Sequence, residues 1–443
     1  MNSRVLCSDN STKEKEKYFQ SSNYLWANSQ LILHLDTIAI IVSFVLNIII
    51  SSYGIASDRQ AFSLNKVFWI FNLLFLSLVP FGQFLSGSFP WERTFNNNII
   101  LSANGLILLC QIVYVAVREK SNKDFSENQD EQNKPNIKIK PLLLLYLFAC
   151  TILIAFTNEG RFWERNNGIS IENGTLQLLT DKVLRGICLF GFLSSLYLWQ
   201  QKKIKTELLV LLLLAGIFSN FPTAVPRYWL ATLYLAALLI FFRKILLRQR
   251  HLFNVTLIIA CIFIFPLLTV LRYSSKEINT KFSSVQDVFS FSFLGGDFDA
   301  YSSLCSTIHY VSQNGITWGR QLSTVLLFFI PRSIWQNKSV GSGALVNRLE
   351  HSDFTNFSSP FIAEGYINFG VVGSVIFIAF LAWGISKYDN WYWHTGKRNF
   401  NYLVYTPAIG MLFFMLRGDL LSSFAYSVGL YFSGWISYKI SQK

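Results

Sequence analysis

The chain has 443 residues, of which 52% are hydrophobic, 16% aromatic and only 14% charged, whereas soluble proteins carry about 25% charged residues. This composition excludes an ordinary soluble globular protein. The formal charge of +13 could indicate a nucleic-acid-binding protein, but the basic residues interrupt long apolar runs, as basic loops of a membrane protein do. We therefore expect a lipid bilayer, and no nucleic acid, as a partner.

Eleven apolar runs follow a polar N-terminal segment, residues 1–29, in which we expect no cleavable signal. Backbone N–H and C=O groups cannot stay unpaired in lipid, so each run is predicted to be helical. The predicted fold is an all-α polytopic integral membrane protein with about 11 (10–12) transmembrane helices. Eight predicted helices lie in residues 30–271 and three in residues 361–443: 30–50, 66–86, 98–117, 141–157, 183–200, 207–222, 227–242, 252–271, 361–385, 402–416 and 420–438.

Three basic segments between the predicted helices indicate the orientation. They are the linker 118–140 with six basic residues, QKKIK at 201–205 and RKILLRQR at 243–250. If the intervening helices cross in pairs, all three lie on one side, which the positive-inside rule makes cytoplasmic. Residues 272–360 then form one large periplasmic loop. The orientation of residues 1–29 stays open, since the KEKEK segment favours neither side.

Residues 321–331 in the predicted external loop begin like a membrane helix but stop at Pro331 and Arg332. Ten helical residues cover about 15 Å, roughly half of a hydrocarbon core. If this segment crossed the membrane, Lys387, Lys397 and other C-terminal basic residues would lie outside. The charge rule therefore favours a short re-entrant or interfacial helix in residues 321–331.

Basic residues collect on the predicted external side and are candidates for binding an anion. Arg332 and Lys338 flank Trp335 and precede a Gly-Ser-Gly segment whose backbone N–H groups can bind phosphate. Arg227 and Arg417 lie at the mouths of two predicted helices. Arginine binds phosphate through bidentate, charge-assisted hydrogen bonds. The alternative for each residue is anchoring to lipid headgroups, with Trp335 as an interfacial belt residue. Further arginines on this side are Arg161, Arg165 and Arg272.

Carboxylates on the same side are candidates for a general base. Glu364 lies early in an apolar helix, where an acid indicates a functional site or, alternatively, a buried partner for an arginine. Asp297 and Asp299 in GGDFDA resemble the DxD of nucleotide-sugar transferases, but nucleotide sugars are cytoplasmic and this segment is predicted to be external. A hydroxyl-activating or sugar-binding role fits them better. Asp419 is expected to pair with Arg417.

His309 and His351 could act as bases, although a loop histidine is more often only solvated. No residues have metal-ligand spacing, and we find no glycine-rich nucleotide loop and no Ser-His-Asp order. We therefore expect neither a metal nor another cofactor.

Three segments together resemble the Wzy-type oligosaccharide repeat unit polymerases of bacteria, which make O-antigen or capsule. They are GGDFDA, GRQLSTVLLFFIPRSIWQNKSVGSG and SPFIAEGYINFGVVGS, within residues 295–374. The PRSIW and AEGYINFG pieces are the specific ones. Gln336 and Ser339 stand where the family pattern W-P-x-K-P has prolines, so the loop around Lys338 is expected to be less rigid. The resemblance highlights Asp297, Asp299, Gly319, Arg320, Pro331, Arg332, Trp335, Lys338, Glu364 and Asn368.

The resemblance implies a reaction at the periplasmic face of the bacterial inner membrane, without a metal. A growing glycan on undecaprenyl pyrophosphate is transferred to a new lipid-linked repeat unit, and undecaprenyl pyrophosphate leaves. Arg332, Arg227 and Arg417, with Arg320 and Lys338, would bind the pyrophosphate, and Glu364, or else Asp297 or Asp299, would be the base. A chain-length regulator protein is a possible partner by analogy.

Two alternatives remain open. An O-antigen ligase has a similar layout but transfers the glycan to lipid A core. A lipid-linked oligosaccharide flippase or other transporter would usually show internal repeats and short loops, which the long external segment argues against.

Overall fold

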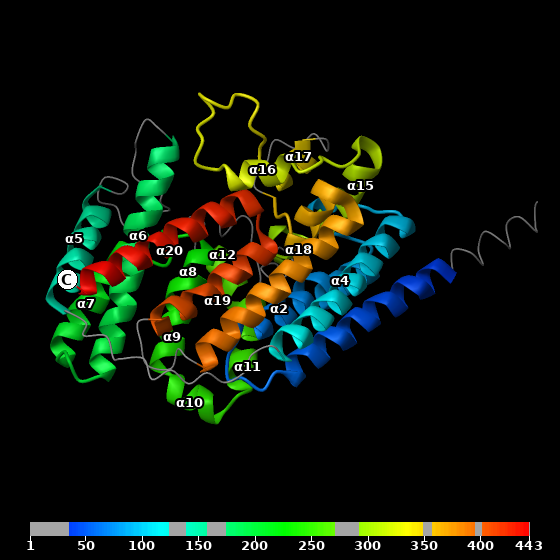
Figure 1. The fold of residues 1–443 in the computed structure, drawn as a ribbon. Coiled ribbons are helices and arrows are strands. Elements are labelled where there is room, and N and C mark those ends of the chain that lie inside the picture. Colours follow the sequence, from blue (N-terminus) through cyan, green and yellow to red (C-terminus); the bar gives the residue numbers. More distant parts are fainter. Residues whose placement is uncertain are drawn as a thin grey trace, which may run out of the picture.

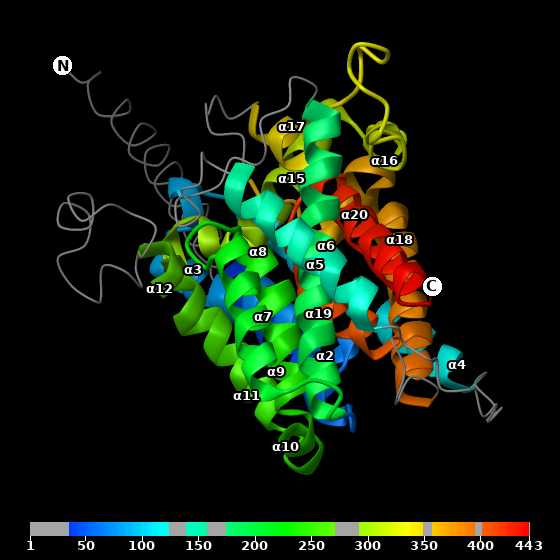
Figure 2. The same cartoon turned by 90° about the vertical axis from the view of Figure 1, so that its left-hand side faces the viewer.

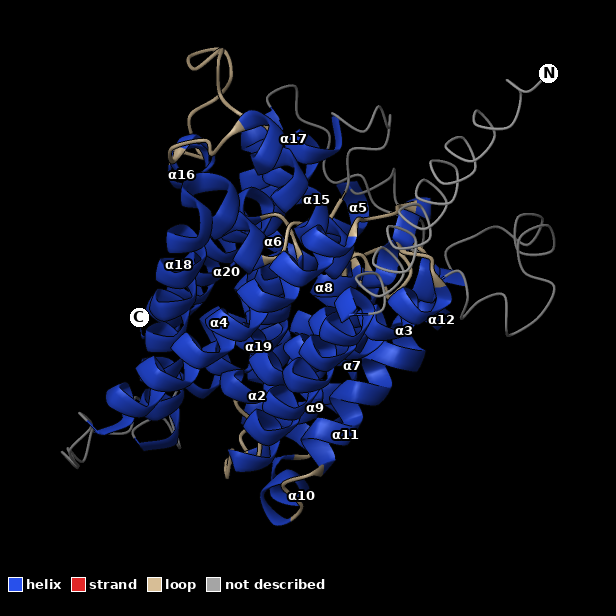
Figure 3. Ribbon diagram, turned by 90° about the vertical axis from the view of Figure 1, so that its right-hand side faces the viewer, coloured by secondary structure: helices blue, strands red, loops and turns tan. Residues whose placement is uncertain are grey.

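The computed structural model describes residues 35–123, 139–156, 174–270, 292–348, 357–394 and 401–442. Within these ranges the chain consists of helices joined by turns, and only an isolated bridge between Phe89 and Arg93 has β pairing (Figure 3). The predicted all-α fold is therefore confirmed for the described residues. Outside them lie residues 1–29, most of the linker 118–140, and residues 271–291 and 349–356 of the predicted external loop.

A helix forms at each of the eleven predicted apolar segments, and three of these helices contain a π-helical stretch. The first helix is Leu35–Ser57. The others are α2 (Leu64–Phe71) continued by η1 (Asn72–Leu78) and α3 (Val79–Ser86), α4 (Asn97–Lys123), α5 (Ile139–Phe156), α6 (Gly174–Gln200), α7 (Thr206–Ser219), α8 (Arg227–Leu230) continued by η4 (Ala231–Leu235) and α9 (Ala236–Phe241), α11 (Leu252–Ile259) continued by η5 (Ala260–Ile264) and α12 (Phe265–Val270), α18 (Phe361–His394), α19 (Asn401–Arg417) and α20 (Leu420–Gln442).

Five helices are long and apolar enough to cross a membrane by their length and composition. The first of them exposes large apolar side chains such as Ile38, Val42 and Ile49, which suits a surface in contact with lipid. These helices agree with the prediction of a helical membrane protein. The five are Leu35–Ser57, Leu64–Ser86, Asn97–Ser121, Lys182–Gln200 and Phe361–His394.

The helices pack into one bundle, with α5, α6 and α7 on one flank and α4 on the other (Figure 1). In the middle, α18 packs on α4, α20 packs on α6, and α19 packs on α2 and η4. The short basic helix α10 (Arg243–Arg248) lies at one end of the bundle. The helices α15 (Ala300–Asn314), α16 (Arg320–Leu326) and α17 (Ser342–Arg348) cover the opposite end (Figure 2).

A buried polar network fastens the end of α18 that is farther from α15, α16 and α17. Asp389 accepts hydrogen bonds from the Leu64 backbone N–H at 3.0 Å and from the Tyr405 hydroxyl at 2.6 Å. Arg118 lies 3.5 Å from Asp389 and 3.9 Å from Asp58. A single carboxylate thus joins α2, α4, α18 and α19, and its charge is compensated by an arginine, as a buried charge requires.

The short helix predicted at 321–331 is shorter in the structure, where α16 spans Arg320–Leu326 and the following residues form turns. Two features keep a helix from continuing to Pro331. Pro331 has no backbone N–H for the Leu327 carbonyl and disfavours helical backbone at Ile330. In addition, the Lys338 ammonium group donates hydrogen bonds to the carbonyls of Phe328 and Ile330 at 2.7 and 2.8 Å, so these acceptors are satisfied without a further helical turn.

Candidate functional site

The GGDFDA segment forms a tight turn, η6 (Gly296–Phe298), directly before α15. Its aromatic residue anchors it, since Phe298 is 1% exposed and stacks on Phe75 at 4.7 Å and on Phe293 at 4.9 Å between ring centroids. Because Phe298 is held in the core, the carboxylates on either side of it, Asp297 and Asp299, are fixed at the mouths of the neighbouring helices.

Two arginines from separate helices meet these carboxylates. Arg227, the first residue of α8, forms an ion pair with Asp297. Arg417, the last residue of α19, lies 3.0 Å from Asp299 and also donates to the Gly296 carbonyl. Both arginine side chains are 29% exposed, against 9% for Asp297 and 2% for Asp299. The arginine side chains are therefore partly accessible, whereas the carboxylates that pair with them are buried.

The expected pairing of Arg417 with Asp419 is wrong. Arg417 pairs with Asp299, 118 residues earlier in the chain. Its Nε is buried and has no hydrogen-bond partner among the described residues, so one donor of this guanidinium remains unsatisfied. We use "arginine–aspartate site" below for Arg227, Arg417, Asp297 and Asp299.

Close helix packing brings the two arginines together. A Cβ atom on Gly410 of α19 would lie 2.5 Å from the backbone nitrogen of Thr232, so only glycine allows this approach to η4. Nearer the mouth, Tyr228 stacks on Phe414 at 4.0 Å, and both rings lie beside Tyr426 of α20. The Lys182 ammonium group sits 4.4 Å above the Tyr426 ring, in a cation–π contact.

Glu364 lies beside this site but is oriented differently from an exposed base. It is 1% exposed, and its two oxygens accept hydrogen bonds from the Ser342 hydroxyl at 2.7 Å and from the Leu420 backbone N–H at 3.1 Å. It forms no ion pair with a described arginine, contrary to the alternative weighed from the sequence. Its geometry joins the starts of α17 and α20 to α18.

Asp419 acts on the same two helix starts. One oxygen accepts hydrogen bonds from the backbone N–H groups of Leu421 and Ser422, at 2.9 and 3.3 Å. A Cβ atom on Gly341 would lie 2.1 Å from the Asp419 carboxylate, so the segment before α17 runs directly over this side chain. Burial raises the pKa of Asp419.

Asn368 connects α18 to α16. Its side-chain oxygen accepts from the Leu322 backbone N–H at 3.0 Å, and its nitrogen donates to the Glu364 carbonyl at 2.8 Å. Directly after it, α18 kinks at Phe369 and Gly370, where the glycine has a φ of 65°. The AEGYINFG segment is therefore a helical elbow that positions α16, α17 and α20 around the arginine–aspartate site.

The loop after α16 holds most of the remaining predicted residues, and it uses them internally. Arg332 donates to the carbonyls of Lys338 and Ser339 at 2.6 and 2.9 Å, and Arg320 donates to the Asn337 carbonyl at 3.3 Å. Burial and the charge of Arg332 lower the pKa of Lys338. Arg320 and Arg332 are exposed, whereas Trp335 is half-buried. No contact between these side chains and the arginine–aspartate site is seen in the described structure.

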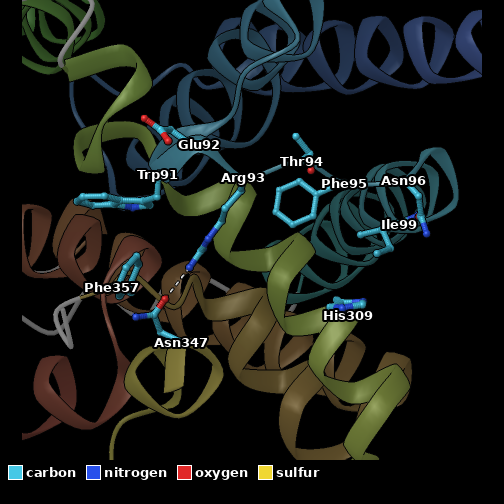
Figure 4. A pocket seen from close by; sticks show the side chains of 10 residues that line it. All are labelled: Trp91, Glu92, Arg93, Thr94, Phe95, Asn96, Ile99, His309, Asn347 and Phe357. Carbon is cyan, nitrogen blue, oxygen red and sulfur yellow. Dashed lines mark hydrogen bonds between the residues drawn. The ribbon is translucent and has the colours of Figure 1, made fainter. Parts of the chain in front are cut away.

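A cavity of about 790 Å³ opens next to the arginine–aspartate site (Figure 4). This cavity was not predicted from the sequence. One of its walls is a strained turn, in which Trp91 and Glu92 have positive φ angles of 67° and 56°. Arg93 donates to Asn347 at 2.7 Å and lies 4.9 Å above the Phe357 ring (Figure 4). The cavity is lined by Trp91, Glu92, Arg93, Thr94, Phe95, Asn96, Ile99, His309, Asn347 and Phe357.

Of the other residues singled out in the sequence, His309 lines this cavity and is hydrogen-bonded to Gln313 at 3.0 Å. Arg161, Arg165, Arg272 and His351 lie outside the described residues. No group of three or more His, Cys, Asp or Glu side chains suited to a metal is present in the described part of the chain. No protein-family model, curated protein or solved structure matches the chain.

Proposed function

We propose that this chain polymerises lipid-linked oligosaccharide repeat units at the periplasmic face of a bacterial inner membrane, for O-antigen or another surface polysaccharide. The bond between the anomeric carbon of the growing glycan and the pyrophosphate of its undecaprenyl carrier breaks. A bond from that carbon to a hydroxyl of a new lipid-linked repeat unit forms. Undecaprenyl pyrophosphate leaves with the bonding electrons, and the hydroxyl proton passes to a carboxylate of the protein.

The arginine–aspartate site is the observation that carries this proposal. Arg227 and Arg417 present partly exposed side chains at the ends of apolar helices, where the headgroup of a membrane-bound substrate would lie. Guanidinium donors aimed at a leaving diphosphate stabilise the charge that develops on it.

The geometry changes the order of the candidate bases. Glu364 is inaccessible and fully engaged with Ser342 and Leu420, so we assign it a positioning role. Asp299 already accepts from Ser358, whose hydroxyl lies 2.7 Å away, in addition to Arg417. Asp297 is the more exposed of the two aspartates, and its partner Arg227 is one of the proposed diphosphate ligands. We therefore propose Asp297 as the proton acceptor.

The proposal includes the finer topology: eleven membrane crossings and one external segment, residues 272–360, containing the short helix α16. On this topology the arginine–aspartate site and the loop with Arg332 and Lys338 face the periplasm. The loop would contact the membrane surface through Ile334, which is 77% exposed, and Phe329, which is 53% exposed.

Gene deletion tests the function and separates it from its rivals. Loss of a polymerase leaves single repeat units on the carrier lipid and on the cell surface. Loss of a ligase leaves long polymer attached to the carrier, and loss of a flippase leaves repeat units confined to the cytoplasmic leaflet. Long chains in the deletion strain, free or on carrier lipid, would contradict the proposal.

A further inference from the structure

The cavity adjoins the arginine–aspartate site through two of its lining residues, Trp91 and Phe357. The Trp91 indole packs against Gly296, where a Cβ atom would approach it to 2.5 Å, and the carbonyl of the same glycine accepts from Arg417. On the next wall, Phe357 precedes Ser358, whose hydroxyl donates to Asp299. Two lining residues of the cavity therefore neighbour residues that are hydrogen-bonded to the arginine–aspartate site: Trp91 contacts Gly296, and Phe357 precedes Ser358.

The lining of the cavity combines aromatic faces with polar side chains. Trp91 and Phe357 meet edge to face at 5.2 Å between ring centroids, and the Trp91 side chain is still 41% exposed. Arg93, Asn96 and His309 contribute planar groups that donate or accept hydrogen bonds (Figure 4). Sugar rings have apolar C–H faces and a hydroxyl rim, so an aromatic surface bordered by such groups matches both parts of a sugar.

Size and charge agree with the same ligand. The volume of about 790 Å³ lies within the roughly 300–1,000 Å³ typical of small-molecule sites. Glu92 and Arg93 oppose each other in charge, and Arg93 is already engaged with Asn347, so the lining is not the cluster of cations that a diphosphate needs. The cavity also borders the start of α4 at the bundle end, away from the apolar middle where a lipid chain would lie.

We infer that this cavity binds the sugar rings at the non-reducing end of the acceptor repeat unit, with Trp91 as the stacking surface and His309 on the opposite wall. This inference rests on the proposed function, because it assigns the second substrate of the same reaction. The acceptor hydroxyl would then approach the anomeric carbon from the cavity side, past Gly296. The cavity, and not the arginine–aspartate site, would select which sugar is accepted.

The test is direct binding of a free glycan to the purified full-length protein in detergent. The probe is the host's own repeat-unit oligosaccharide, released from its carrier lipid by mild acid and therefore without diphosphate. Saturation-transfer NMR and titration should show binding to the wild-type protein. Trp91→Ala should weaken it about tenfold, or about 1.4 kcal/mol, which is within the range measured for aromatic contacts. Trp383→Ala, which removes a tryptophan 48% exposed on α18, is the matched control and should bind like wild type.

His309→Trp covers the case in which Trp91→Ala does not fold, because His309 is exposed and a larger ring there narrows the cavity opposite Trp91 without removing a core contact. It should weaken binding. The inference is overturned if the wild-type protein does not bind the free oligosaccharide, or if both variants bind it as tightly as wild type does. If the glycan binds as expected but the deletion strain still makes polymer, the cavity assignment stands and the polymerase function fails.

Discussion

Substitutions of Arg417 and Asp299 can distinguish a structural role of this ion pair from a role in catalysis. Arg417→Gln removes the ion pair at 3.0 Å and the hydrogen bond to the Gly296 carbonyl. Asp299→Asn removes only the negative partner and leaves the guanidinium in place. The double variant Arg417→Gln/Asp299→Asn removes both charges and leaves two neutral amides that can bond to each other.

The single and the double variant are expected to differ in stability but to lose activity alike. Hydrogen bonds to charged groups contribute about 1.5–3 kcal/mol each, so Arg417→Gln should lower the free energy of unfolding by about 2–4 kcal/mol. The double variant should recover part of that loss, because Asp299 no longer carries an uncompensated charge. Polymerisation should fall about 10²–10³-fold in Arg417→Gln and in the double variant, since both lack the Arg417 donor to the leaving group.

The assay combines thermal unfolding of the purified variants with gel analysis of glycan length in a complemented deletion strain. Arg118→Gln is the matched control, because Arg118 also pairs with buried carboxylates but at the other end of the bundle. Arg118→Gln should lower the free energy of unfolding but leave the ladder of glycan lengths intact when compared at equal protein level. A full ladder from the double variant would refute the reasoning, because it would show that Arg417 only neutralises Asp299.

Three further predictions follow from other side chains. Arg332→Ala removes the hydrogen bonds to the Lys338 and Ser339 carbonyls that hold the loop after α16, so long chains should be lost while the protein level stays normal, as checked by gel and immunoblot; a full ladder would show that polymerisation does not need this loop conformation. Glu364→Gln should lower the free energy of unfolding by about 2 kcal/mol by weakening its bond to Leu420, yet leave residual polymer; complete loss of polymer at normal stability would instead make Glu364 the base. Because the pKa of Asp419 is raised on folding, the folded state holds the proton of this carboxyl more tightly than the unfolded state does. Stability should therefore fall as the pH rises from the ordinary range of that carboxyl through its raised pKa. Asp419→Asn should flatten this dependence in thermal scans. An unchanged pH profile for Asp419→Asn would contradict that assignment.

The sequence predicted the helices well, because a helix in lipid is dictated by local composition. All eleven apolar runs became helices with ends within a few residues of the prediction, except where polar ends extend them, as in α6 and α18. The length of α16 was the main difference. Its end depends on the Lys338 ammonium group taking carbonyls from a preceding turn, a tertiary contact that no helical pattern encodes.

The candidate site was predictable as a list of residues but not as a set of pairs. The sequence indicated Arg227 and Arg417 because they lie at the mouths of predicted helices, and Asp297 and Asp299 because of the GGDFDA motif. It could not show that Phe298 would be buried and so turn both aspartates toward those arginines. The pairing crosses 70 residues for Arg227 and 118 for Arg417, and it is determined by packing of the bundle.

The cavity was missed for a different reason. Its walls come from the turn after α3, from α15 and α17, and from the segment before α18, so no local stretch carries the pattern. The one local signal is the pair of residues with positive φ at Trp91 and Glu92, and backbone strain is not visible in a sequence when glycine is absent.

The resting charge of the arginine–aspartate site bears on how a diphosphate could be bound there. Each guanidinium is compensated by one carboxylate, so the site carries no net charge in the described structure and avoids the cost of isolated cations near lipid. A diphosphate competes with the aspartates for the same N–H donors. Under the proposed function, Arg227 cannot turn fully to the diphosphate without weakening its pair with Asp297, so that an Asp297 oxygen leaves the ion pair and can accept the hydroxyl proton while the donor substrate is in place. Leaving-group binding and proton acceptance are then coupled through one side chain, Arg227.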